Sequence, residues 1–142
     1  MFRKYITESI ADKTGVNLDN LLVQFTLESF NMVTQAHIYH LLTKSYAEHI
    51  AIGDFYESLG GCIDIIAETA IGMDIEVSAS EHNYNLQFAY TRDDLRFKLA
   101  DYRNLVSTLI EKTNNKNIMS INDKLINIQQ LIDNLNYKLE LS

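Results

Sequence analysis

Apolar residues recur every three or four positions along most of the chain, and this spacing predicts amphipathic helices. The first predicted helix spans residues 18–42, with Asn17 as its N-cap and Asp19 in its first turn. Its apolar positions are Leu18, Leu21, Leu22, Phe25, Phe30, Val33, Ile38 and Leu41. A second helix is predicted over 44–73, with Thr43 as its cap. Its apolar positions include Ile50, Ile52, Phe55, Tyr56, Leu59, Ile63, Ile66, Ala67, Ala70 and Ile71.

The second half of the chain repeats this pattern after a less periodic segment. Residues 74–90 are expected to form a long connection with one short helical turn. The segment from Thr91 to Asp94 predicts the start of a helix, and that helix is expected to reach residue 113. Ser120 with Asp123 predicts the cap of a last helix that runs to the C-terminus. We therefore expect a leader over 1–16 and one domain of four helices over 17–142.

The lengths of the connections predict how these helices are arranged. The first and last connections are short, so each joins an antiparallel pair. The middle connection of about 17 residues could reach roughly 55 Å, longer than a helix of about 25 residues. It can cross the whole bundle and leave the second and third helices parallel. The expected fold is therefore an all-α, ferritin-like four-helix bundle with one long crossover.

Two glycines interrupt the second predicted helix. Gly60 and Gly61 each cost about 1 kcal/mol relative to alanine in a helix interior. They predict either a close approach by another helix or a local bend.

Composition supports helices and excludes several classes of protein. The chain has no proline and five glycines, too few for the turns of a β-sandwich or barrel. The net charge of −7 argues against tight DNA binding, and the single Cys62 excludes an intramolecular disulfide. No apolar run approaches the length of a membrane span. We expect a cytoplasmic location, or a place within a virion if the role is structural.

A cluster of ionisable residues in the first two helices suggests metal chemistry. Asp64 and Glu68 lie four residues apart, so they share a helix face with Ile63, Ala67 and Ile71. Two carboxylates on such a half-buried stripe would repel each other unless a cation lay between them, and iron with oxygen and imidazole ligands would serve. The alternatives are a solvated acidic stripe, or a surface that meets lysine and arginine of a neighbouring chain.

The spacing of the histidines and carboxylates is similar to that of a known family. His49 follows His37 by 12 residues, and Asp64 and Glu68 follow His37 by 27 and 31. In this spacing, in Gln35-Ala36-His37 and in the segment from Ile63 to Glu68, the chain resembles the mini-ferritins, the Dps-like branch of the ferritin-like superfamily. Weaker likeness in the last two helices extends the resemblance over 18–141.

The resemblance implies a metal site formed between two subunits. His37 and His49 would come from one subunit, and Asp64 and Glu68 from the other. It also implies Fe²⁺ binding, ferroxidase activity, and storage of ferric mineral in a dimer-based, dodecamer-like homo-oligomer. Zn²⁺ would be a surrogate for iron.

Several positions near these ligands differ from the family's pattern or add to it. Where the family has a further carboxylate, this chain has Gly53, so we expect one well-occupied metal per site and a weaker second. Asp54 and Glu57 are weaker candidate ligands nearby. His40, one turn after His37, is either an extra ligand, a residue supporting the ligands, or a structural histidine. The functional alternative is a structural or virion-associated assembly protein with the same fold and little or no turnover.

Overall fold

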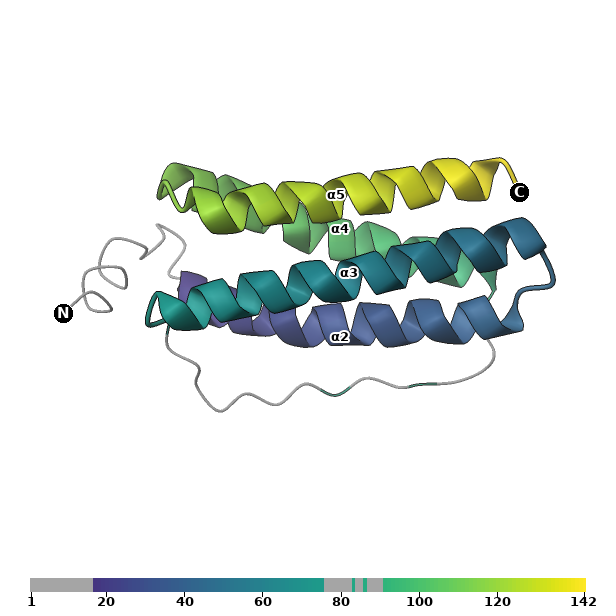
Figure 1. Cartoon of the computed structure of the whole chain (residues 1–142), viewed down its shortest axis with the longest axis horizontal. Coiled ribbons are helices and arrows are strands. Elements are labelled where there is room, and N and C mark those ends of the chain that lie inside the picture. Colours follow the sequence, from purple (N-terminus) through teal and green to yellow (C-terminus); the bar gives the residue numbers. More distant parts are fainter. Residues whose placement is uncertain (1–16, 76–82, 84–85, 87–90) are drawn as a thin grey trace.

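A computed structural model describes residues 17–75, 83, 86 and 91–142, and these form an all-α four-helix bundle (Figure 1). The helices are α2 (Leu18–Leu42), α3 (Tyr46–Gly72), α4 (Arg92–Asn115) and α5 (Met119–Glu140). The all-α four-helix prediction is confirmed, with helix ends within about three residues of those expected. The leader over 1–16 and most of the connection over 74–90 lie outside the described residues.

The helix starts follow the predicted capping chemistry in two of four places. Asn17 accepts a hydrogen bond from the Asp19 backbone N–H at 2.8 Å, and Thr91 and Asp94 form a reciprocal capping box. The other two predictions were wrong. Ser45, not Thr43, caps α3, while α5 begins after Ile118 with no side-chain cap.

The four helices form a square in cross-section. Helix α2 packs against α3 and α4, and α5 packs against the same two helices. Within the described part of the chain, α2 and α5 lie on one diagonal and α3 and α4 on the other. Arg92 at the start of α4 lies 3.4 Å from Glu48 at the start of α3, so these two helices begin at the same end and run parallel (Figure 1). This is the orientation that a long crossover requires.

The core runs the length of the bundle and is made of large aliphatic and aromatic side chains from all four helices. Its fully buried members include Phe25, Ile52, Leu59, Ile63, Ile66, Leu95, Leu99, Leu109, Ile121, Leu125 and Ile128. Four apolar residues that the periodicity assigned to helix faces are instead exposed: Phe30, Leu41, Ile50 and Ile71. All four lie on α2 or α3, so this hairpin keeps apolar surface that its own bundle does not cover.

Gly60 and Gly61 do not break α3 into two helices. Helix α3 is continuous through both, and no described atom outside the local backbone lies within 4 Å of a Cβ built at either position. The close approach that they predict is therefore not made by the described part of this chain. The described helices also include none that is both long and apolar enough to cross a membrane.

Candidate metal-binding site

Three of the predicted site residues meet near the turn between α2 and α3. The imidazole rings of His40 on α2 and His49 on α3 stack with centroids 3.7 Å apart and planes 20° apart. His37, one turn before His40, stacks on Tyr56 of α3 at 4.6 Å. His40 meets Tyr56 edge to face at 5.4 Å, so Tyr56 contacts both histidines of α2.

His40 and His49 are joined by two reciprocal hydrogen bonds. His40 Nδ1 lies 2.7 Å from the His49 carbonyl oxygen, and His49 Nδ1 lies 2.9 Å from the His40 carbonyl oxygen. A carbonyl oxygen only accepts, so each Nδ1 must carry the proton and donate. In the neutral rings the free lone pair is then on Nε2, the arrangement in which metal-ligating histidines are usually held.

Gly53 makes the position of His40 sterically feasible. It is buried on α3, and a Cβ added there would lie 3.1 Å from His40 Cε1 and 3.3 Å from His40 Nδ1. Such contacts are tighter than van der Waals packing allows without movement of the ring. The position that lacks the expected carboxylate is therefore occupied by an imidazole from the neighbouring helix.

The two predicted carboxylate ligands lie elsewhere on the same helix. With a rise of 1.5 Å per residue, Asp64 and Glu68 are about 22 and 28 Å along α3 from His49. In the described residues, no group of three or more histidine, cysteine, aspartate or glutamate side chains is placed to hold a metal. One chain therefore does not bring the four predicted ligands together, and a site shared between two subunits stays a prediction.

Asp64 and Glu68 are both exposed, as are the weaker candidates Asp54 and Glu57. The prediction that Asp64 and Glu68 lie on a half-buried stripe is wrong for the isolated chain. Water screens their repulsion there, so the pair needs a cation only if another molecule covers it. A cation between these carboxylates therefore requires another molecule to pack against this face.

Comparison with known proteins identifies the family of this chain, and the matched segment extends over the last three helices. A family model matches residues 40–139, from the last turn of α2 almost to the end of α5. The chain belongs to the Family of unknown function (DUF5856). No curated protein and no solved structure matches the chain. The DUF5856 match contains His40, His49, Asp64 and Glu68, and it begins three residues after His37.

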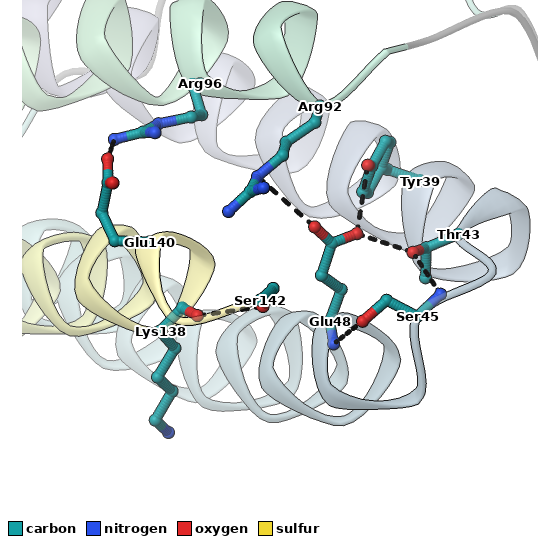
Figure 2. A network of polar contacts seen from close by, with 9 residues as sticks. All are labelled: Tyr39, Thr43, Ser45, Glu48, Arg92, Arg96, Lys138, Glu140 and Ser142. Atoms are coloured by element: carbon teal, nitrogen blue, oxygen red, sulfur yellow. Dashed lines mark hydrogen bonds and ion pairs between the residues drawn. The ribbon is translucent and has the colours of Figure 1, made fainter.

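A buried carboxylate of the DUF5856 segment organises the end of the bundle beside the histidines (Figure 2). Glu48 is 5% exposed and accepts hydrogen bonds from Tyr39 Oη at 3.2 Å and Thr43 Oγ1 at 2.7 Å. Its other oxygen faces Arg92. Burial, and then the Glu48 carboxylate, raises the pKa of Tyr39. Glu48, the residue that precedes His49, therefore ties the start of α3 to the end of α2 and to the start of α4.

The role of Glu48 was missed in the sequence, although a signal for it was present. Ser45 and Glu48 have the serine-x-x-glutamate spacing of a capping box. In the structure the Ser45 hydroxyl accepts from the Glu48 backbone N–H at 3.3 Å, while the Glu48 side chain turns into the bundle instead. The serine-x-x-glutamate pattern therefore marks the start of α3 correctly, but the side-chain partners of the Glu48 carboxylate depend on the position of α4.

Proposed function

We propose that this DUF5856 protein binds Fe²⁺ and oxidises it to Fe³⁺ at sites shared between two copies of the chain. His37 and His49 of one copy would provide imidazole ligands, and Asp64 and Glu68 of the partner subunit would provide carboxylates. Each Fe²⁺ would give one electron to dioxygen, with four Fe²⁺ and four protons reducing one O₂ to two waters, and a closed homo-oligomer would store the ferric product. The spacing that the chain has in common with mini-ferritins supports this proposal.

The observation that carries the proposal is the division of the ligands into two separate groups. The imidazoles lie at one end of the α2–α3 hairpin, with His37 near the end of α2 and His49 near the start of α3, whereas both carboxylates lie in the last third of α3. On an ideal helix His49, Asp64 and Glu68 fall within an arc of about 100°. Both groups are thus presented on one side of α3, about 22 Å or more apart.

A two-fold axis would bring the two groups together. Glu57 lies eight residues after His49, and seven and eleven residues before Asp64 and Glu68. Suppose that the two-fold axis crosses α3 near Glu57. Measured along α3, His49 would then lie about 12 Å from the axis. The two carboxylates of the partner subunit would lie about 10 to 17 Å from the axis on the same side as His49. A self-complementary interface of this kind is the usual basis of a homodimer, and it creates two equivalent sites.

The surface around this axis has the character of such an interface. Phe30, Ile50 and Ile71 are 48%, 45% and 60% exposed, and a cavity of about 160 Å³ between α2 and α3 is lined almost wholly by apolar side chains, Ile71 among them. Gly60 leaves open space near the proposed axis, where a second helix could approach closely. Covering this face would also remove water from around Asp64 and Glu68. Their repulsion would then no longer be screened, so a cation between them would be needed.

Subunit complementation tests the shared site directly. His49→Ala and Glu68→Ala would each be purified, unfolded, mixed and refolded together, and Fe²⁺ binding measured under anaerobic conditions. Each variant alone lacks one ligand in every site, but a mixed dimer has one intact site. Random mixing should therefore restore about a quarter of wild-type binding. No restoration would refute the shared site, and an oligomer whose wild type binds no metal would favour the structural alternative.

A further inference from the structure

We propose that His40 is a positioning residue for His49, and that Gly53 is the residue that makes this possible. The inference rests on the proposed function in one respect only, namely that His49 is a metal ligand. The interlocked geometry of the two rings stands independently of any metal. In the sequence, His40 had three open interpretations, and the structure favours support of a neighbouring ligand.

The two histidines restrain each other in two ways: the rings stack, and each Nδ1 bonds to the backbone carbonyl of the other residue. The stack at 3.7 Å fixes the plane of the His49 ring, and the hydrogen bond from His49 Nδ1 to the His40 carbonyl fixes its rotation and tautomer. The His40 ring is held equally by its own Nδ1 bond to the His49 carbonyl. The nitrogen of His49 that no described residue bonds is thus Nε2, and the ring does not need to reorient before that atom binds a metal.

The absence of a side chain at residue 53 is what leaves room for this arrangement. Glycine in the interior of a helix is less favourable than alanine, so Gly53 has a local cost in α3. The neighbour that a Cβ would meet at 3.1 Å is a ring fixed by a stack and a hydrogen bond, which cannot move without loosening both. Alanine at residue 53 should therefore favour the helix and disturb the histidine pair.

Gly61 provides a matched control on the same helix. It is exposed, and no atom of the described residues beyond the local helix backbone lies within 4 Å of a Cβ built there. Gly61→Ala should give the same improvement in helix propensity as Gly53→Ala without touching His40. Light scattering on both variants would verify that each keeps the wild-type assembly size.

The first measurement needs no metal. In ¹⁵N-labelled, metal-free protein, at a pH where the imidazoles are neutral, two-dimensional NMR of the ring nitrogens should show the Nδ1–H tautomer for both His40 and His49. Gly53→Ala should move these signals toward a mixture of tautomers, and Gly61→Ala should leave them in place. Identical signals in wild type and Gly53→Ala, or a wild type with protonated Nε2, would overturn the positioning role.

The second measurement separates this inference from the proposed function. Residues that orient a metal-ligating histidine typically change metal affinity by about 10- to 100-fold. We expect Gly53→Ala and His40→Ala each to weaken Zn²⁺ or Fe²⁺ binding by about 10-fold, and Gly61→Ala to leave binding unchanged. Wild-type protein that shows the predicted tautomers but binds no metal would refute the proposed function. Metal binding that survives both substitutions would refute the role of His40.

Discussion

Arg92 Nε lies 3.4 Å from a Glu48 carboxylate oxygen and joins the first turns of two parallel helices. The Glu48 side chain is 7% exposed and that of Arg92 is 34% exposed, so the carboxylate is the buried partner. Two hydroxyls from the end of α2, those of Tyr39 and Thr43, donate to the other oxygen of Glu48. Three helices therefore meet at one carboxylate, next to the histidine pair.

Removing this carboxylate should destabilise the bundle. Glu48→Ala leaves two hydroxyls and a partly buried guanidinium without their partner, and we expect a loss of about 2–3 kcal/mol in the free energy of unfolding. Urea denaturation followed by circular dichroism measures it. Glu140→Ala is the control, because Glu140 pairs with Arg96 at the surface and should cost less than about 1 kcal/mol. Equal losses in the two variants would contradict the central role of Glu48.

Tyr102 should make stability fall in alkaline solution. Its hydroxyl is 2.7 Å from Ser29 Oγ inside the bundle, and burial raises the pKa of Tyr102 well above the ordinary value of 10.0. The folded state keeps the proton that the unfolded state releases, so this contribution is complete below pH 10 and is lost as pH rises above it. Tyr102→Phe should therefore show a shallower alkaline loss of stability than wild type. Parallel urea titrations near pH 8 and pH 11 test the difference.

The carboxylates should differ sharply in their importance for metal binding. Glu68→Ala removes one of four proposed ligands and should abolish most Fe²⁺ or Zn²⁺ binding. Asp54→Ala should have little effect, because Asp54 lies about 100° around α3 from Gly53. Equilibrium dialysis with metal analysis measures both. In crystals soaked with metal, anomalous peaks should lie about 2.0–2.3 Å from His37, His49, Asp64 and Glu68, and peaks elsewhere would contradict this assignment.

The exposed face of α2 and α3 should mediate self-association. Phe30→Glu would place a charge in the proposed interface, and we expect smaller assemblies or monomers at micromolar concentration. Phe97→Glu on α4 is the matched control, since Phe97 is 74% exposed and lies outside the proposed interface. Multi-angle light scattering gives the mass of each variant. A wild-type monomer of 16.3 kDa would contradict the prediction at once.

DNA should not bind tightly. The chain has 12 basic and 19 acidic residues, so the net charge of −7 repels phosphates. We expect no gel shift with submicromolar protein at about 150 mM salt. A clear shift under these conditions would contradict the expectation.

The sequence by itself determined the helices and their orientation. Periodicity is a local property, so four helices could be placed within a few residues. Connection lengths were sufficient to orient α3 parallel to α4. Helix caps were less predictable, because Thr43 and Ser45 both have suitable side chains and packing decides between them. In the structure Ser45 caps α3, while the Thr43 hydroxyl donates to the buried Glu48 carboxylate.

Tertiary structure decided which apolar and polar residues are buried. Phe30, Ile50 and Ile71 fit the helical period as well as the core residues do, but they lie on the side of the hairpin that α4 and α5 leave uncovered. The stack of His40 on His49 likewise joins two helices and depends on the missing side chain at Gly53. Spacing along one helix specifies a face, whereas contact between helices depends on how closely their backbones approach, and that distance is set by the whole core.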